Sequence, residues 1–263
     1  MIKYLRLGLF GGYKILFSSF RFRKFVKNKD KYSLKERYDY THRFVLKMNK
    51  AFHFVPIVEG TENLPEGQCF ITPNHQSVMD PVVLMDVLEK PISFVAKKEV
   101  STYPFAGNIL KAIDGKFIDR ADLRSELKVF REMDQNMEKE KELSYVIFPE
   151  GTRSKKENGF ELLSFHPGSF KPAMRKGLPI VPVCIYQTDR ILNQDYHYRF
   201  YPVQVHFLKP ILEEEYQDLS TAQVANLVHD RVYEELEKMK KQDVELIRKL
   251  NGYSEEKAIR VSK

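Results

Sequence analysis

A histidine and an aspartate lie five residues apart in residues 74–81, Asn-His-Gln-Ser-Val-Met-Asp-Pro. A continuous helix would place His75 and Asp80 about 140° apart around its axis. However, Asp80-Pro81 is typical of a helix start, which predicts a bent connection that returns the carboxylate to the imidazole. A carboxylate fixes the tautomer of an imidazole and stabilises its charged form, so His75 is a candidate general base and Asp80 its partner. The same residues also fit a helix cap beside an incidental surface histidine.

A second polar segment, Phe-Pro-Glu-Gly-Thr-Arg-Ser at residues 148–154, follows an apolar run. Ligands of α/β proteins gather beyond the carboxyl ends of strands, which suits a functional loop here. Gly151 permits close backbone approach, and the planar fork of Arg153 matches a phosphate group. A turn with surface charges is the alternative interpretation.

Composition excludes several other kinds of chemistry. The phosphate-binding loops Gly-x-Gly-x-x-Gly and Gly-x-x-x-x-Gly-Lys and the zinc motif His-Glu-x-x-His are absent. Cys69 and Cys184 are the only cysteines and lack the spacing of a metal or redox site, which indicates a reducing compartment. Hydrophobic residues make up 43% of the 263 residues and charged residues 30%, so neither a disordered chain nor a polytopic membrane protein fits.

The elements that must position these motifs alternate between strands and helices. Apolar runs bounded by turn residues predict strands at 53–58, 68–72, 92–96, 145–148, 179–185 and 203–207. Capping boxes, start residues and amphipathic spacing predict helices at 33–52, 80–88, 124–142 and from Ser220 onward. The alternation predicts an α/β fold with a mixed, largely parallel sheet flanked by helices. We expect this domain to cover residues 53–251 and the tail at 252–263 to fray.

The net charge of +7 is concentrated at the N-terminus. Residues 1–31 hold nine Lys/Arg against Asp30 alone, whereas the remaining residues hold 34 basic and 35 acidic side chains. Lys3, Arg6 and Lys14 interrupt the apolar stretch, so a spanning helix of roughly 20 apolar residues is disfavoured. A cleaved signal peptide is not expected either, because no small-x-small site follows a clean apolar run.

Residues 1–52 are predicted to form a basic, aromatic two-helix motif that associates with membranes. Alternating rings and cations fit a helix in the membrane interface, with the rings toward the lipid and the cations toward the headgroups. An ordinary helix packed on the body, with solvated charges, is the alternative. The residues predicted to contact the membrane are Lys3, Arg6, Phe10, Lys14, Phe17, Phe20, Arg21, Arg23 and Lys24.

Taken together and in this order, the motifs resemble the glycerolipid acyltransferase family, and within it the bacterial-type 1-acyl-sn-glycerol-3-phosphate acyltransferases. The similar blocks are the His-x4-Asp block at 74–80, a second at 97–120, the Phe-Pro-Glu-Gly-Thr-Arg-Ser block at 148–154 and a proline-containing one at 177–183. The resemblance covers about residues 53–210, and the N-terminal segment fits the family's two-helix membrane motif. The chain departs from the pattern at residues 100–102, where a Leu-Phe pair is usual, and at Ala106.

The resemblance implies a reaction and a place for it. His75 would take the proton of the free hydroxyl of lysophosphatidic acid, whose oxygen attacks an acyl thioester of coenzyme A or acyl carrier protein to give phosphatidic acid. No cofactor, metal or covalent acyl-enzyme is expected, since a thioester is already activated. The implied location is the cytoplasmic face of the cell membrane, as a peripheral or monotopic protein. Contacts with the acceptor and its phosphate are implied for Lys97, Arg120, Glu150, Gly151, Thr152 and Arg153.

Two other functions remain open from the sequence. The acceptor can instead be glycerol 3-phosphate or another lysophospholipid, because the blocks are shared. A protein of another class, a non-catalytic peripheral membrane protein, would use the basic segment alone. Nucleic acid is not an expected partner, because no nucleic-acid-binding motif is present and aromatic residues among the cations favour lipid.

Overall fold

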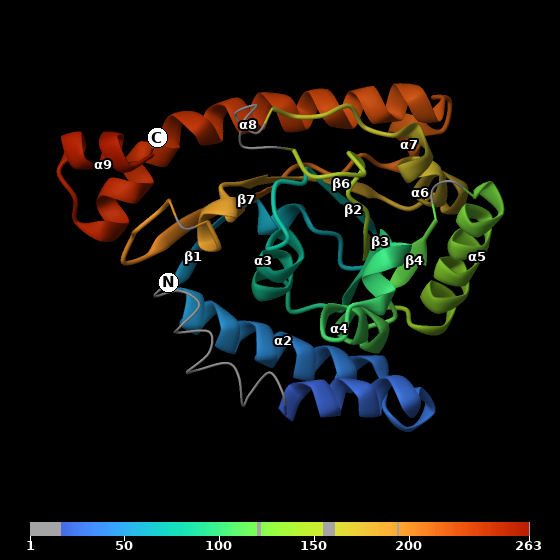
Figure 1. Ribbon diagram of the computed structural model, residues 1–263. Coiled ribbons are helices and arrows are strands. Elements are labelled where there is room, and N and C mark those ends of the chain that lie inside the picture. Colours follow the sequence, from blue (N-terminus) through green and yellow to red (C-terminus); the bar gives the residue numbers. More distant parts are fainter. Residues whose placement is uncertain (1–16, 120–121, 155–160, 194, 263) are drawn as a thin grey trace.

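The computed structural model describes residues 17–119, 122–154, 161–193 and 195–262, in which seven strands form one sheet (Figure 1). The strands are β1 (Phe54–Glu59), β2 (Phe70–Pro73), β3 (Ile92–Lys97), β4 (Lys116–Ile118), β5 (Ser144–Val146), β6 (Ile180–Tyr186) and β7 (Tyr201–Phe207). Their order is β1-β7-β6-β2-β5-β3-β4. Every neighbouring pair is parallel except β6–β7, which is antiparallel. The expected mixed, largely parallel sheet is confirmed.

Helices cover both faces of this sheet. They are α2 (Leu34–Phe52), α3 (Asp80–Val87), α4 (Ala106–Ala112), α5 (Leu123–Lys139), α6 (Lys171–Lys176), α7 (Glu213–Tyr216), α8 (Thr221–Asn251) and α9 (Glu255–Ser262). In Figure 1, α8 runs along one side of the sheet, and α2, α3 and α4 lie on the other. Alternation along β6 supplies both layers of the core: Val181 packs on the α3 side, and Cys184 packs on the α8 side.

Local signals account for most helix boundaries. The Ser33 and Ser220 capping boxes begin α2 and α8 as expected, and the left-handed residue Gly252 (φ 64°) ends α8. The start of α3 differs from the expected start by one residue: Met79 is the cap, and Asp80 is the first helical residue. The reason is that the Asp80 carboxylate accepts hydrogen bonds from residues that precede the helix instead of capping it.

Residues 252–263 were expected to fray, and this expectation is wrong for the residues that the structure describes. Residues Glu255–Ser262 form α9, in which Ala258 is fully buried in the core. The Tyr198 hydroxyl donates a hydrogen bond to the Val261 carbonyl at 2.6 Å. The turn at Gly252 lets α9 fold back, so apolar burial orders the tail.

The N-terminal helix, described over residues 17–27, packs with one face and exposes the other. Phe22 and Phe25 are buried in an aromatic cluster with residues of α2 and α4. Phe17 and Phe20 are 69% and 62% exposed, and the cations Arg21, Arg23 and Lys24 are also exposed. The predicted membrane contacts Lys3, Arg6, Phe10 and Lys14 lie outside the described residues.

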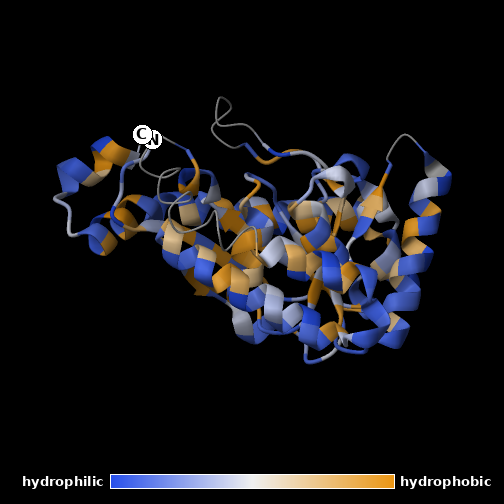
Figure 2. Cartoon of the chain, turned by 60° about the horizontal axis from the view of Figure 1, so that its bottom comes forward, coloured by the Kyte–Doolittle hydropathy of each residue, from blue (hydrophilic) through white to orange (hydrophobic). Residues whose placement is uncertain are grey.

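Figure 2 views the molecule from the side on which the N-terminal helix and α2 lie. Hydrophilic and hydrophobic residues are interspersed on this side. Among the described helices, none combines the length and apolar character needed to cross a bilayer. The face of the N-terminal helix that packs through Phe22 and Phe25 agrees with the alternative interpretation, an ordinary helix packed on the body. The outer face keeps the exposed rings and cations on which the membrane prediction depends.

Candidate active site

The predicted site segments converge because they follow neighbouring parallel strands. β6, β2, β5 and β3 are adjacent and parallel, so their carboxyl ends meet at one edge of the sheet. His75 follows β2, residues 148–154 follow β5, and Lys97 ends β3. Thr188, which begins the short helix η6 (Thr188–Ile191), follows β6. This edge therefore collects residues from four separate parts of the chain.

The histidine and aspartate of the first motif are bonded to each other. His75 Nδ1 lies 2.6 Å from Asp80 Oδ2, so the bent connection expected from the sequence is present. Asp80 is fully buried, and its Oδ2 also accepts the backbone N–H groups of Gln76 at 2.7 Å and Ser77 at 2.9 Å. Its other oxygen, Oδ1, accepts the hydroxyl of Thr188. Hydrogen bonds thus replace water around a buried negative charge.

The imidazole is held in one orientation with one nitrogen left for chemistry. Its ring stacks on Phe148 with centroids 4.2 Å apart, and its side chain is 19% exposed. Because Nδ1 faces Asp80, the nitrogen that can take a proton is Nε2, which bonds to no residue in the part of the chain that the structure describes. The geometry is that of a general base with a fixed tautomer.

Glu150 lies behind the histidine. Its Oε1 accepts the backbone N–H of His75 at 2.5 Å, and its Oε2 accepts the N–H of Leu163 at 3.1 Å. The residue is 2% exposed. Burial raises the pKa of Glu150 to about 7, although both backbone hydrogen bonds act to lower it. The resemblance implied contact with the acceptor; in the structure this carboxyl lies against the backbone, where it joins the 148–154 segment to the turn at residues 74–80.

A second backbone link reinforces this junction. The His75 carbonyl accepts hydrogen bonds from the Ser154 N–H at 2.8 Å and from the Ser154 hydroxyl at 3.2 Å. Gly151, which lies between Glu150 and Ser154 in the sequence, has φ 69°, a left-handed conformation that favours glycine. Hydrogen bonds of both Glu150 and Ser154 therefore join the 148–154 segment to the His75 backbone.

Two of the predicted cations are exposed at the same edge. Lys97 and Arg153 are exposed, as is Thr152, and neither cation forms an ion pair with a described residue. Exposed cations at the edge that also holds the His75–Asp80 pair suit an anionic ligand. Arg120 lies outside the described residues, directly after the strand β4 and the residue Asp119. Within the described residues, no cluster of three or more His, Cys, Asp or Glu side chains could hold a metal ion.

Sequence reasoning missed the partners that β6 supplies. Asn74 forms a pair of hydrogen bonds with the backbone of Ile185, at 2.9 and 2.7 Å, and the Gln76 side chain accepts the Gln187 N–H at 2.8 Å. Thr188 is 108 residues from Asp80 in the sequence. The one available signal was that a hydroxyl residue lies two positions after a buried strand whose carboxyl end is at this edge.

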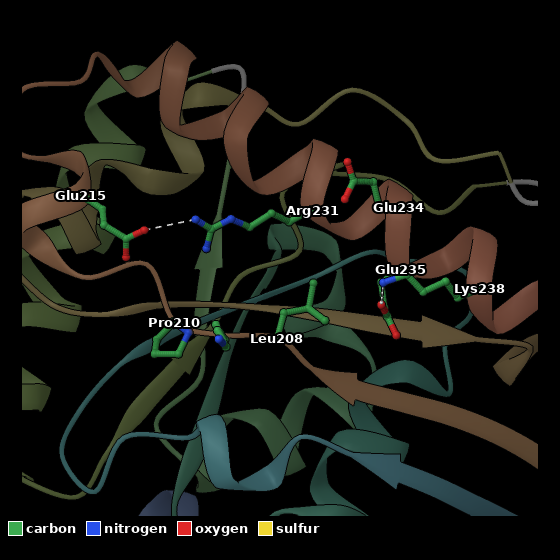
Figure 3. Close-up of a pocket in the computed structure, with 8 residues that line it drawn as sticks. Leu208, Pro210, Glu215, Arg231, Glu234, Glu235 and Lys238 are labelled. Atoms are coloured by element: carbon green, nitrogen blue, oxygen red, sulfur yellow. Dashed lines mark hydrogen bonds and ion pairs between the residues drawn. The ribbon is translucent and has the colours of Figure 1, made fainter.

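A second histidine–carboxylate pair lies on the face of the sheet that α8 covers. His206 of β7 places Nδ1 2.8 Å from Glu235 Oε1, and Glu235 also bonds to Lys238 at 2.8 Å. Figure 3 shows Glu235 and Lys238 side by side on α8, at a pocket that Arg231 and Glu215 also line. The His206 side chain is 4% exposed. None of the sequence motifs includes this pair.

Comparisons with known proteins point to one family. Residues 55–186 match the model of the acyltransferase family. A yeast (Saccharomyces cerevisiae) 1-acyl-sn-glycerol-3-phosphate acyltransferase is 30% identical over 75% of this chain and 61% of its own length. A relative of the same name from Borreliella burgdorferi is 28% identical over 70% of this chain and 72% of its own.

The match spans about three fifths of the length of the yeast relative and of a coconut relative, at 61% and 63%. Among solved structures, the 1-acyl-sn-glycerophosphate acyltransferase PlsC from Thermotoga maritima superimposes with a TM-score of 0.63 at 25% identity. That match covers 91% of this chain and 94% of the other. Because the family model matches residues 55–186, half of the chain, this chain belongs to the acyltransferase family.

Proposed function

We propose that the protein transfers a fatty acyl group from an acyl thioester to the sn-2 hydroxyl of 1-acyl-sn-glycerol 3-phosphate, giving phosphatidic acid. The observation that carries the proposal is the His75–Asp80 pair, joined at 2.6 Å with the aspartate fully buried and the imidazole partly exposed. The names of the yeast and Borreliella relatives support this acceptor.

The residues suggest a direct transfer. His75 Nε2 takes the proton of the acceptor hydroxyl as that oxygen attacks the carbonyl carbon of the thioester, forming a C–O bond. The C–S bond then breaks, and the thiol of the donor leaves with the proton from the imidazolium. The Asp80 carboxylate stabilises the imidazolium between these two steps, and a general base of this kind contributes about 10²–10⁴-fold to the rate. Neither a metal nor an acyl-enzyme is needed for this sequence of steps.

The phosphate of the acceptor is assigned to the exposed cations of the same edge. Lys97 ends β3, and Arg153 follows β5. Because β3 and β5 are parallel neighbours, the chain segments that carry these cations leave the sheet at the same edge. Arg120 joins them in this proposal through its position after β4, the neighbour of β3.

A membrane surface is the proposed place of the reaction, because a lysolipid acceptor resides in a bilayer. The outer face of the helix at residues 17–27 presents Phe17 and Phe20 together with three exposed cations, Arg21, Arg23 and Lys24. Each cation near an anionic surface adds up to about 1 kcal/mol, and the rings add a part that salt does not weaken. We assign the protein to the cytoplasmic face of the cell membrane, as a peripheral or monotopic protein.

The proposed reaction is tested with purified protein and a matrix of substrates. 1-Acyl-sn-glycerol 3-phosphate, glycerol 3-phosphate and a zwitterionic lysophospholipid are each combined with a coenzyme A or an acyl-carrier-protein thioester, and products are identified by mass. Phosphatidic acid from the first acceptor is expected. A product from glycerol 3-phosphate alone would move the assignment to that acceptor, and no product from any pair would reject an acyltransferase.

The membrane assignment is tested by vesicle co-sedimentation of a Phe17→Ser, Phe20→Ser double variant. These rings are exposed, whereas deletion of the helix would also remove the buried Phe22 and Phe25 from the aromatic cluster. Tyr233→Ser on α8 is the matched control, since Tyr233 is a 50% exposed aromatic elsewhere on the surface. Weaker binding of the double variant to anionic vesicles, with normal binding of the control, is expected; equal binding of both would reject the assignment.

A further inference from the structure

We propose that Thr188 is a positioning residue for the His75–Asp80 pair, holding one oxygen of Asp80 so that the other faces the imidazole. Thr188 and Asp80 are both fully buried, and the Thr188 hydroxyl bonds to Asp80 Oδ1. The inference rests on the proposed acyl transfer, for which His75 is the base.

The two oxygens of the Asp80 carboxylate are bonded unequally. Oδ2 faces three donors: the imidazole Nδ1 and the backbone N–H groups of Gln76 and Ser77. For Oδ1, the bond from Thr188 is the one hydrogen bond within the part of the chain that the structure describes. An ionised carboxylate only accepts, so the hydroxyl must donate. Without it, Oδ1 would be a buried charged oxygen with no partner, which favours rotation of the carboxylate away from the imidazole.

The threonine itself is held firmly against the catalytic turn. Directly before it, Gln187 has a left-handed conformation (φ 67°), and its N–H bonds to the Gln76 side chain at 2.8 Å. Two residues after it, the fully buried Arg190 forms a two-point ion pair with Asp243 of α8, at 2.9 and 2.7 Å. The 187–190 segment is thus fixed on both sides of Thr188, which gives the hydroxyl a defined direction.

This arrangement joins two segments of the chain that meet only in the folded protein. The bond between Asn74 and Ile185 anchors the start of the turn to the end of β6, and Thr188 anchors its end through Asp80. β6 and the segment that follows it therefore orient His75 indirectly, through Asn74 and Asp80, and do not touch the reacting atoms. Thr188 acts through Asp80 and is not a catalytic residue in its own right.

The test compares Thr188→Val, which removes the hydroxyl, with Thr188→Ser, which keeps it. A hydrogen bond to a charged group corresponds to about a tenfold to hundredfold effect, so kcat of Thr188→Val should fall by about that factor with KM for both substrates unchanged. Thr188→Ser should restore most of kcat. Thr41→Val is the matched control, because Thr41 is equally buried and its hydroxyl bonds only within α2.

A second readout needs no substrate. The Nδ1 proton of His75 in its short bond to Asp80 should give a downfield NMR resonance, identified by its loss in His75→Ala, since His206 forms a comparable bond to Glu235. We expect this resonance to move or vanish in Thr188→Val and to remain in Thr188→Ser and Thr41→Val. Thr188→Ala provides a smaller variant without the hydroxyl if the valine variant does not fold.

The outcomes separate the two proposals. A wild-type protein without acyl transfer rejects the proposed function, and the resonance then still decides whether Thr188 positions the pair. Wild-type activity and an unchanged resonance in a folded Thr188→Val or Thr188→Ala variant overturn the inference. Equal losses of kcat in the valine, alanine and serine variants also overturn it, because packing and not the hydroxyl would then be responsible.

Discussion

Two histidine–carboxylate pairs in this protein have nearly the same short contact but different surroundings. His75 Nδ1 lies 2.6 Å from Asp80, and His206 Nδ1 lies 2.8 Å from Glu235. The first imidazole is 19% exposed, whereas the second is 4% exposed and its Nε2 is buried with no hydrogen-bond partner in the described chain. A paired imidazole can act as a base only where its second nitrogen can reach a substrate.

The carboxylates differ as well. Asp80 is fully buried and takes two backbone N–H groups and a hydroxyl, so it has one orientation. Glu235 is 17% exposed and shares its charge with Lys238 on the surface of α8. The comparison indicates that access and a fixed carboxylate, more than the pairing itself, suit His75 and not His206 to act as a base.

Replacing the accessible histidine should have the largest effect. His75→Ala removes the base, and we expect kcat/KM for acyl transfer to fall by about 10²–10⁴-fold with an unchanged thermal midpoint. Apart from its bond to Asp80, the ring stacks on Phe148 at the partly exposed edge of the sheet, so the fold should persist. Turnover near that of the wild type in a folded His75→Ala protein would remove this residue from the mechanism.

Neutralising a cation at the catalytic edge should have the next largest effect. Arg153→Gln should raise the KM of the lysolipid acceptor by about 10-fold to 100-fold, as for a lost bond to a charged group, and change kcat no more than KM. Arg231→Gln is the control, because Arg231 pairs with Glu215 at the α8 pocket. A change confined to the KM of the thioester would reassign Arg153 to the donor.

Glu150 should give the catalytic region a characteristic pH dependence of stability. Its pKa of about 7 lies above the usual 4.5, so between these values the folded protein keeps a proton that the unfolded chain has lost. The free energy of unfolding should therefore fall as pH rises through this window, by about 2–3 kcal/mol. Urea unfolding at about pH 5 and about pH 8 measures this, and Glu150→Gln should flatten the slope. Parallel slopes in both proteins would contradict the assignment.

The second pair should show the opposite sign and the smallest effect. Burial acts to raise the pKa of Glu235, but the hydrogen bonds from Lys238 and His206 outweigh it and hold that pKa below its usual range. Glu235 therefore contributes stability above the unfolded pKa, which is lost as the pH falls through the folded value. Glu235→Gln should remove this loss of stability at acid pH. The loss amounts to less than about 1 kcal/mol of the free energy of unfolding, because solvent screens the site. Acyl transfer should stay at the wild-type level, and a fall comparable with that of His75→Ala would erase the distinction between the pairs.

Local patterns predicted most of the fold. The capping boxes at Ser33 and Ser220 and the apolar runs at the strands are encoded within a few residues, and the structure contains them nearly as expected. Five short elements were not predicted: α4, α6, α7, α9 and β4. β4 is three residues long, too short for a period to show, and α9 is ordered by the burial of Ala258 against distant segments.

The sequence by itself determined that His75 and Asp80 meet, because they lie only five positions apart on either side of a bend. Short-range order of this kind is visible in residue types and spacing, and so is the parallel sheet that brings the strand ends together. Only the tertiary structure decided what surrounds the pair. It turned Glu150 toward the backbone, placed Thr188 behind Asp80 and buried His206. Those outcomes depend on contacts between segments as much as 108 residues apart, whose hydrogen bonds and burial exist only after the strands have packed.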